Sequence, residues 1–589
     1  MSTRRLLAYV ARHRRAYLTG FVLSLVSTAL QLANPWVLRT AIDGIQSGAA
    51  ARLLLGLAAA YVGVSVTGGF IRFHWRMRML GAGRRIEYEI RNDYFAHLQR
   101  LHQGFFQHTR TGDLMARAIN DLNAVSRLVS AGLMHSSNTI IMFFAASALM
   151  FTIDRPLALL VMVILPMVSV VFVLLGRRIH RQFERVQEQF STLSARAQEN
   201  FSGIRVVKAF AQEAAEIDAF AAINQEFVTR ALRLARTSGV LWPAMAFILG
   251  TASALVLWQG GVAVVVGRIT LGQLVQFFGY LMMLSWPMIA LGWTTNLVQQ
   301  GMASMRRLDA IFNTKPAIAD PGARGARAPA PAARGGLRGE IEFRHVTFSY
   351  NGATVLHDIT LRIPGGTTVA IVGPTGSGKT TLISLIPRLL DPTTGTVLID
   401  GIDIRLLPLA MLRGGIGVVP QEPFLFSDTL EENLALGIEA GDGQRVREAA
   451  EIARLDGDIG DFPLGYQTMV GERGVTLSGG QKQRATIARA LARDPAILIL
   501  DDALSSVDTN TEEAILTGLR RFAAERTSLI ISHRISTVRG ADLIVVLDDG
   551  RIVERGTHDA LVAAGGLYAD LYRKQLLREA LEADEAVPS

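Results

Sequence analysis

The 589-residue sequence contains no cysteine. Disulfide bonds, thiolate zinc sites and iron–sulfur clusters are therefore excluded within this chain. Ionised side chains are also scarce, since Asp, Glu, Lys and Arg make up 19% of the residues whereas hydrophobic residues make up 50%. This balance is unusual for a soluble protein and indicates segments that lie in a membrane.

Six stretches in the first half of the chain lack any ionised residue. Each covers about 19 residues or more, the length that a helix rising about 1.5 Å per residue needs to cross the hydrocarbon layer. Buried helices of a soluble protein could explain one such stretch but not six, so we predict six transmembrane helices. The stretches are 16–38, 53–71, 132–151, 156–176, 239–267 and 269–305.

Arginines orient these helices. The flanks 1–15, 72–131 and 177–238 carry five, ten and ten Lys plus Arg, whereas the connections 39–52, 152–155 and 268 carry two, one and one. By the positive-inside rule, both termini and both long segments are predicted to face the cytoplasm from an inner (plasma) membrane, with an uncleaved first helix. The net charge of +9 then reflects arginines at an anionic membrane surface rather than a nucleic-acid site.

The long polar segments and a composition change define the predicted domains. The two segments of about 60 residues are too long for structureless loops, and helices continuing into them would reach roughly 40 Å out, with tips at 109–122 and 199–213. Residues 313–339, rich in Pro, Gly, Ala and Arg, are predicted to be a linker. We therefore predict a membrane domain at 1–312, an α/β domain at 340–576 and a short acidic tail at 577–589.

A glycine-rich loop indicates nucleotide binding. The segment TVAIVGPTGSGKTTLISLI (368–386) reads as strand, loop and helix, and it fits the pattern G-x-x-x-x-G-K-[ST]. In this pattern backbone N–H groups surround phosphates at a helix N-terminus. Lys379 is expected to contact the β- and γ-phosphates, and Thr380 is expected to hold Mg²⁺.

Two further segments belong with this loop. The apolar run ILIL (497–500) ends in Asp501 and Asp502, at the carboxyl edge where α/β sheets place their ligands, and Asp501 is expected to reach Mg²⁺. The segment LSGGQ (477–481) precedes a basic amphipathic helix and reads as a second anion-binding helix start. One explanation is a simple helix cap, and the other is the γ-phosphate of a nucleotide held by another subunit.

The order of these motifs, with ISH at 531–533, resembles the ATP-binding cassette (ABC) family. Six membrane spans in front of one cassette resemble a half-exporter of the multidrug or lipid type. The resemblance implies an all-α membrane domain with long cytoplasmic extensions, fused to a C-terminal α/β P-loop cassette. It also implies ATP hydrolysis coupled to transport, with ATP and Mg²⁺ as cofactors.

The resemblance assigns roles to individual residues, which match the family's motifs by position. The catalytic residues would be Asp502, His533 and Gln421, and Mg²⁺ would be held by Thr380, Gln421 and Asp501. ATP would be bound by Tyr350, which stacks on adenine, and by Gly373, Thr375, Gly376, Ser377, Gly378, Lys379, Thr380 and Thr381. The signature that closes over the partner's ATP would be Leu477, Ser478, Gly479, Gly480 and Gln481, and the dimer loop would contain Ser505, Ser506 and Asp508. Coupling to the membrane domain would involve Thr111, Gly112, Asp113, Lys208 and Glu472.

Asp502 departs from the family pattern, in which this position is usually the catalytic Glu. The pKa values of the two residue types are similar, but the shorter arm moves the carboxylate by roughly 1–1.5 Å, and a displacement of that size can cost about 10²-fold in rate. The change could be tolerated, with water or backbone adjustment filling the gap. Because the signature is intact, we instead favour one subunit of a heterodimer whose two ATP sites are unequal, over a homodimer.

The cargo is weakly encoded. No ionised group lies within the six apolar stretches, which disfavours a proton relay and suits a hydrophobic or amphipathic cargo beside membrane lipids. A homodimeric lipid flippase or drug exporter, and an ATP-binding regulatory membrane protein, are the alternatives. An importer and a nucleic-acid enzyme fit less well.

Overall fold

The computed structural model describes residues 2–320, 336–438, 442–471 and 477–585. These residues form two compact units. The first unit is Met1–Gln99 with Arg110–Thr314, and the second is Arg100–Thr109 with Lys315–Ser589.

The described part of the first unit is built from helices. Within it, six helices are long and apolar enough to cross a membrane, which confirms the predicted six-helix domain. All described α-helices of this unit, short ones included, are α1 (Ser2–Arg12), α2 (Arg14–Gln46), α3 (Ala51–Arg100), α5 (Thr111–Ala116), α6 (Leu122–Arg127), α7 (Leu133–Ile153), α8 (Arg155–Ser202), α9 (Ile204–Ala209), α10 (Glu213–Val265) and α11 (Leu271–Phe312). Two π-helical turns, η1 (Arg117–Asp121) and η2 (Leu128–Gly132), join α5, α6 and α7.

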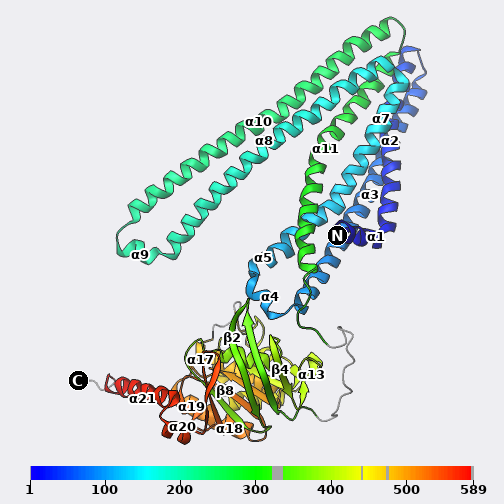
Figure 1. Ribbon diagram of the computed structural model, residues 1–589. Coiled ribbons are helices and arrows are strands. Elements are labelled where there is room, and N and C mark those ends of the chain that lie inside the picture. The colour runs from blue at the N-terminus through cyan, green and yellow to red at the C-terminus, as the bar shows by residue number, and fades with distance from the viewer. Residues whose placement is uncertain (1, 321–335, 439–441, 472–476, 586–589) are drawn as a thin grey trace. The chain divides into compact units, whose positions relative to one another are not determined.

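The long helices extend well past the apolar stretches, as predicted. Helices α8 and α10 pack along one another and are joined at one end by the short helix α9 (Figure 1). With 48 residues, α8 is about 70 Å long at ~1.5 Å per residue. Its fully buried residues, such as Leu157 and Leu165, come from its first third, so the remainder of this hairpin is packed mainly within itself.

Local sequence signals set the helix ends on the side of the short connections. Asp154 caps α8 by accepting a hydrogen bond from the Leu157 backbone N–H (3.0 Å) and pairs with Arg268 (2.7 Å). Thr270 and Gln273 form a reciprocal capping box at the start of α11. These caps fix where α8 and α11 begin and hold the connection between α10 and α11 against α8.

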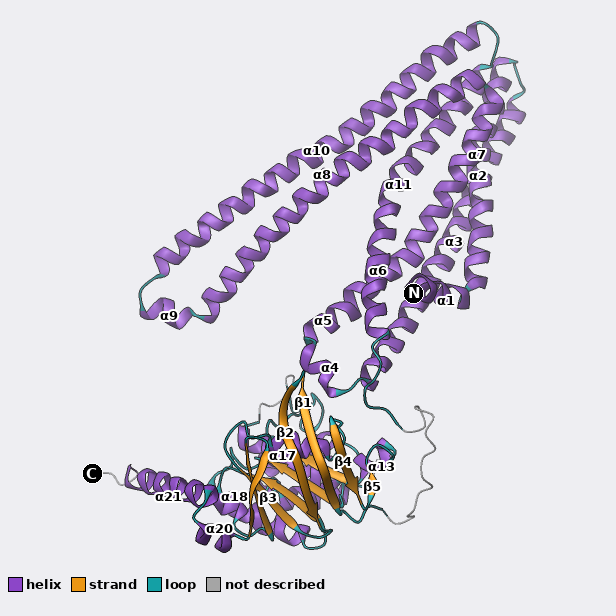
Figure 2. Cartoon of the chain, in the orientation of Figure 1, coloured by secondary structure: helices purple, strands orange, loops and turns teal. Residues whose placement is uncertain are grey.

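The described strands lie in the second unit and form two sheets (Figure 2). The antiparallel sheet has the order β2-β1-β4-β5, and the larger sheet has the order β10-β9-β3-β8-β7-β6, in which only β10 pairs antiparallel. The strands are β1 (Ile341–Tyr350), β2 (Ala353–Ile363), β3 (Thr368–Val372), β4 (Thr394–Ile399), β5 (Ile402–Asp403), β6 (Ile416–Val419), β7 (Ile497–Asp501), β8 (Thr527–Ile531), β9 (Leu543–Asp548) and β10 (Arg551–Gly556).

Helices of the second unit complete its cores. One apolar core lies between the two sheets and α12, and a second lies under α14, α15, α16 and α17. The helices are α4 (Gln103–His108), α12 (Lys379–Leu385), α13 (Leu409–Gly414), α14 (Leu430–Leu434), α15 (Gly443–Ile452), α16 (Asp456–Asp461), α17 (Gly479–Ala492), α18 (Thr509–Ala523), α19 (Ile535–Val538), α20 (His558–Ala564) and α21 (Leu567–Glu585), with the 3₁₀ turn η4 (Gly465–Gln467). The predicted α/β architecture is confirmed.

Candidate nucleotide-binding site

The carboxyl ends of four parallel strands meet at one edge of the larger sheet. Strand β3 leads into the glycine loop, β7 ends at Asp501, β8 precedes His533 and β6 precedes Gln421. A cavity of about 220 Å³ opens there. It is lined by Val355, Thr375, Gly376, Gly378, Lys379, Thr380, Thr381, Gln421, Asp501, Asp502, Ile531 and His533. The topology therefore brings together residues that lie far apart in the sequence.

The glycine loop needs glycine at both ends. Gly373 has φ +153°, and a Cβ there would lie 2.0 Å from the Leu547 carbonyl oxygen. Gly378 has φ +96° at the start of α12, and its Cβ would lie 2.9 Å from Leu356. Backbone in this region disfavours side chains, so these glycines turn the loop back onto the helix N-terminus, where its N–H groups can surround phosphate.

Lys379 is held inside the loop. Its Nζ donates to the carbonyl oxygens of Gly373 (2.9 Å) and Pro374 (2.7 Å), and its side chain is buried. Burial lowers the pKa of Lys379, although Asp501 and Asp502 oppose the shift. The ammonium group therefore lies at the cavity. Anionic phosphate oxygens could replace the loop carbonyl oxygens as its hydrogen-bond acceptors.

Asp501 and Thr380 fit a magnesium ion. Asp501 is only 4% exposed, and burial raises its pKa above the usual range, against a hydrogen bond from the Thr380 side chain. A carboxylate and a hydroxyl are the hard oxygen ligands that Mg²⁺ prefers, usually alongside phosphate oxygens and water. Because Asp501 and Thr380 supply two such oxygens at the glycine loop, the donor set fits a cation that shares its other ligands with a nucleotide.

Asp502 adopts an unusual backbone conformation. Its φ is +46°, in the left-handed region where Asp and Asn are more frequent than other non-glycine residues. Its backbone N–H donates to the Ile531 carbonyl oxygen (2.8 Å), which ties the residue to the end of β8. The side chain borders the cavity beside Asp501, so the departure from Glu lies within the site itself.

Two exposed residues border the cavity, and one predicted residue lies elsewhere. Gln421 and His533 are exposed and line it. Tyr350 instead packs edge-on against Phe348, with ring centroids 4.7 Å apart, and borders a different cavity beside α4. The structure therefore groups Gln421 and His533 with the glycine loop, while the adenine-stacking role of Tyr350 stays a prediction.

The signature segment does not line this cavity. Ser478 is the N-cap of α17, where its Oγ accepts from the Gln481 backbone N–H (3.2 Å) and Gln481 Oε1 accepts from the Ser478 N–H (2.9 Å). Leu477 is buried, whereas Ser478 and Gly479 are exposed. A Cβ on Gly480 would lie 3.0 Å from the Ser506 carbonyl oxygen, so the signature backs onto the predicted dimer loop. In that loop Ser505 and Ser506 are exposed, and Asp508 caps α18.

Sequence reasoning missed the residues that hold these segments in place. The buried Gln483 donates to Ser505 Oγ (2.9 Å) and accepts from the Ser506 N–H (2.9 Å). From the same helix α17, Arg489 donates to the Phe424 carbonyl oxygen (2.9 Å), in the segment that follows Gln421. Only their side-chain types were visible in the sequence, because hydrogen-bond partners distant along the chain leave no periodic pattern.

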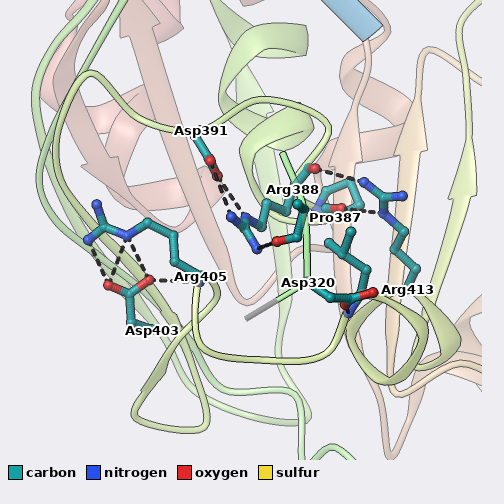
Figure 3. Close-up of polar contacts among 9 residues, drawn as sticks. Asp320, Pro387, Arg388, Asp391, Asp403, Arg405 and Arg413 are labelled. Atoms are coloured by element: carbon teal, nitrogen blue, oxygen red, sulfur yellow. Dashed lines mark hydrogen bonds and ion pairs between the residues drawn. The ribbon is translucent and has the colours of Figure 1, made fainter. Parts of the chain in front are cut away.

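A buried arginine supports the far end of α12. Arg388 is 0% exposed, and its guanidinium donates to Asp391 (2.8 Å) and to the Ala319 carbonyl oxygen (3.3 Å). Arg413 donates to the carbonyl oxygens of Pro387 and Arg388, so two arginines converge on this turn (Figure 3). The helix that starts at the glycine loop is therefore tied at its other end to the segment that leads out of the membrane domain.

The predicted coupling residues lie on exposed tips. Thr111, Gly112 and Asp113 begin α5, and Lys208 lies on α9 and pairs with Glu213 (3.2 Å). Glu472 lies outside the described residues. The segment that groups with the cassette is Arg100–Thr109, directly before the tip expected at 109–122. From this segment, His102 Nδ1 accepts a hydrogen bond from the backbone N–H of Ala317 (3.3 Å), which belongs to the same unit.

Comparisons with known proteins agree with this arrangement. The family model described as "ABC transporter transmembrane region" matches residues 17–288, and the model described as "ABC transporter" matches residues 356–505. The chain is 37% identical over 577 residues to the multidrug resistance-like ATP-binding protein MdlA of Escherichia coli, with 98% of this chain and 96% of that protein covered. It is 36% identical over 578 residues to the ATP-dependent lipid A-core flippase of Syntrophus aciditrophicus, with 97% and 94% covered.

A solved structure shares the whole fold. It is titled "Structure of a bacterial Atm1-family ABC exporter with ATP bound", and it superposes with a TM-score of 0.78 at 30% identity. The match covers 95% of this chain and 98% of that one. The match therefore extends over both the helical unit and the cassette of this chain.

Proposed function

Because this chain belongs to the ABC transporter family, we propose that it is one subunit of a heterodimeric exporter whose own ATP site is the slower one. The chain is a multi-pass membrane protein and an ATP hydrolase coupled to transport. Export as the direction of transport, the class of cargo, the subunit composition and the roles of the site residues are parts of what we propose. It places the assembly in the inner (plasma) membrane with the cassette in the cytoplasm, in line with the arginine distribution.

The proposed transport cycle is alternating access. Two ATP molecules hold two cassettes together, and the tips at α5 and α9 pass that movement to the membrane helices. ATP favours the outward-open state because it binds the closed cassettes more tightly. Support comes from the tip around α9, where Phe201, Val206 and Phe210 are 76%, 61% and 71% exposed. Such an apolar tip is suited to dock on a cassette.

The cargo is proposed to be hydrophobic or amphipathic. The relatives named above are described as a multidrug resistance-like protein and a lipid A-core flippase. The apolar stretches of this chain carry no ionised group, which fits molecules that partition into the membrane rather than ions.

The observation that carries the heterodimer is the pairing of an intact signature with Asp502. Each composite site takes the glycine loop and the residue at 502 from one subunit and the signature from the other. Asp502 lines the cavity together with Lys379 and His533, but its arm is one methylene shorter than Glu. The site that this chain's glycine loop forms is therefore slow, while its signature serves the partner's faster site.

ATP turnover of the purified chain in lipid, measured beside Asp502→Glu, tests the proposal. Turnover near background for the wild-type chain and a rise of about 10²-fold in Asp502→Glu would show that Asp502 limits the rate when the chain pairs with itself. That result would support the proposed slow site. Turnover of several per second by the wild-type chain would contradict a slow site. Absence of turnover in both calls for the same pair of measurements with the co-expressed partner, where Asp502→Glu should again raise the rate.

The alternative is a homodimeric lipid flippase or drug exporter in which Asp502 is the working base. The observation that favours it is the place of Asp502 in the cavity, next to Asp501 and His533. The left-handed backbone at Asp502 also suits Asp better than a longer side chain. Rapid turnover by the chain alone, lost in Asp502→Asn, would select this alternative.

A further inference from the structure

The membrane domain contains a cavity of about 550 Å³ at the ends of three helices. Its volume falls in the range of about 300–1,000 Å³ that is usual for small-molecule sites. All three helix ends adjoin the short connections, the side away from the long helical extensions. The lining residues are Ala29, Leu32, Ala33, Trp36 and Arg39 of α2, Leu149, Thr152 and Ile153 of α7, and Gln276 and Tyr280 of α11.

The cavity changes from polar to apolar along its depth. On α2, Arg39 lies just beyond the apolar stretch, and Ala29 lies ten residues deeper, which is about 15 Å along a helix at ~1.5 Å per residue. That distance is about half of a hydrocarbon core of roughly 30 Å. The polar residue Gln276 lies near the start of α11, while Leu32 and Ala29 form the deep wall. A ligand that fits this gradient has one polar end and an apolar body.

Arg39 supplies the positive charge. Its Nη1 donates to Gln276 Oε1 (3.3 Å), and Gln276 in turn donates to the Tyr280 hydroxyl (3.0 Å). Within the described residues its single carboxylate partner is Asp43, at 3.6 Å. No hydrogen bond or ion pair of the described residues uses its Nη2. The guanidinium is therefore oriented by amide and carboxylate contacts while keeping donors for a ligand.

Asp43 is engaged elsewhere. Its carboxylate accepts from the Gly272 N–H (3.0 Å) and from the Thr270 hydroxyl (3.1 Å), which caps the start of α11. A Cβ at Gly272 would lie 2.4 Å from Asp43 Oδ1, so the close approach depends on glycine. The hydrogen bonds of Asp43 are therefore made at the start of α11, and its ion pair with Arg39 is the longer contact, at 3.6 Å.

We propose that this cavity binds an amphipathic anion, with the acidic headgroup at Arg39 and the hydrocarbon part against Leu32 and Ala29. This inference rests on the proposed export function and narrows its cargo to compounds with one acidic headgroup and an apolar body. Trp36, 56% exposed at the polar end, lies at the depth where its ring can contact both headgroup and chain.

The test uses dioctanoyl phosphatidic acid, dioctanoyl phosphatidylcholine and inorganic phosphate as probes, with binding to the purified full-length chain measured by calorimetry. Phosphatidic acid should bind, and Arg39→Gln should weaken it about 10-fold or more, since a lost hydrogen bond to a charged group has that size. Arg39→Lys should keep most of the affinity. The matched control is Arg52→Gln, because Arg52 is exposed on the same side and outside the cavity.

The apolar half has its own variant. Ala29→Phe should narrow the deep part of the cavity and weaken binding of phosphatidic acid without changing any binding of inorganic phosphate. Equal binding of phosphatidic acid and phosphatidylcholine, or an unchanged affinity in Arg39→Gln, would overturn the inference. Binding of inorganic phosphate as tight as that of phosphatidic acid would also overturn the inference, because the site would then accept a free anion without an apolar body.

ATP turnover measured in the same preparation separates the two proposals. Normal turnover without phosphatidic acid binding would reject this cargo class and leave the export function standing. Binding that follows the predicted order in a chain that never hydrolyses ATP, even with its partner, would contradict the export function alone.

Discussion

The glycine loop and the signature both suit phosphate, but the cassette builds them differently. The loop is enclosed, with Lys379 buried and bonded to loop carbonyl oxygens, and it opens on a cavity shared with Asp501 and His533. The signature has its Ser478 and Gly479 exposed at the start of α17, outside that cavity. The glycine loop thus lines an enclosed cavity, whereas the signature is an exposed surface that could contact only a ligand held by another part of the assembly. This difference is what makes a two-subunit ATP site the natural arrangement.

The largest expected effect comes from damaging the two regions separately in the co-expressed pair. Ser478→Ala should lower total ATP turnover by about 10²-fold, the cost of losing one donor to a developing phosphate charge, because in the proposed heterodimer this signature serves the faster site. Lys379→Ala should lower turnover clearly less, since it damages the site that we propose to be the slower one. Initial rates of phosphate release measure both.

Ser478→Ala also removes the N-cap of α17, so a control variant must measure the effect of losing a helix cap alone. Thr429 caps α14 as Ser478 caps α17, accepting from the Glu432 N–H (3.1 Å), so Thr429→Ala loses a similar cap worth about 1 kcal/mol without reducing turnover as strongly. Equal losses in Ser478→Ala and Lys379→Ala would contradict the unequal pair. A homodimer predicts that result, because every site then contains both residues.

Much of the glycine-loop site and of the membrane helices could be predicted from the sequence. The glycine pattern, the apolar strand before Asp501 and the length of the six apolar stretches are local signals, and local physics decides them. The start of α11 was also encoded, in the capping box of Thr270 and Gln273. The structure ends α10 at Val265, two residues before the expected end of that stretch, because the chain turns at Gly267 with φ +75°.

The supports of the site could not be predicted in this way. Arg388 bonds to Ala319, 69 positions away, and Arg489 bonds to Phe424, 65 positions away. No periodicity links such positions, and only the folded chain shows which arginines are buried. The left-handed backbone of Asp502 was equally hidden, because Asp adopts it less often than ordinary conformations.

A smaller effect is expected where the two regions are joined. Gln483 connects α17 to the loop after Asp502 through two hydrogen bonds, to Ser505 and Ser506. Gln483→Ala leaves these groups without their partner, so we expect turnover to fall about 10-fold and the free energy of unfolding to fall by about 1–3 kcal/mol. Steady-state rates and chemical denaturation of the full chain measure the two effects.

Two further variants define this prediction. Gln483→Glu keeps an acceptor for the Ser506 N–H but loses the donor to Ser505, so its rate should lie between those of wild type and Gln483→Ala. Gln444→Ala removes an exposed glutamine whose side chain bonds to Glu448, and it should leave rate and stability within experimental error. A wild-type rate in Gln483→Ala would mean that the signature and the dimer loop work independently.

The smallest effect tests the electrostatics of the enclosed region. Burial raises the pKa of Asp501, so the folded chain binds this proton more tightly than the unfolded chain, and the ionised carboxylate lowers stability at neutral pH. Asp501→Asn should therefore raise the melting temperature of the ATP-free protein at pH 7, and it should prevent the further rise that we expect Mg²⁺ and ATP to produce in wild type. The difference in melting temperature between the two ATP-free proteins should shrink as pH falls through the raised pKa of Asp501, because the wild-type side chain then becomes neutral too.

The control is Asp461→Asn, at an exposed position, which should change neither the melting temperature nor its rise with Mg²⁺ and ATP. An Asp501→Asn protein less stable than wild type at pH 7 would contradict this prediction, because the favourable contacts of the carboxylate with Lys379 and Thr380 would then outweigh the cost of its burial.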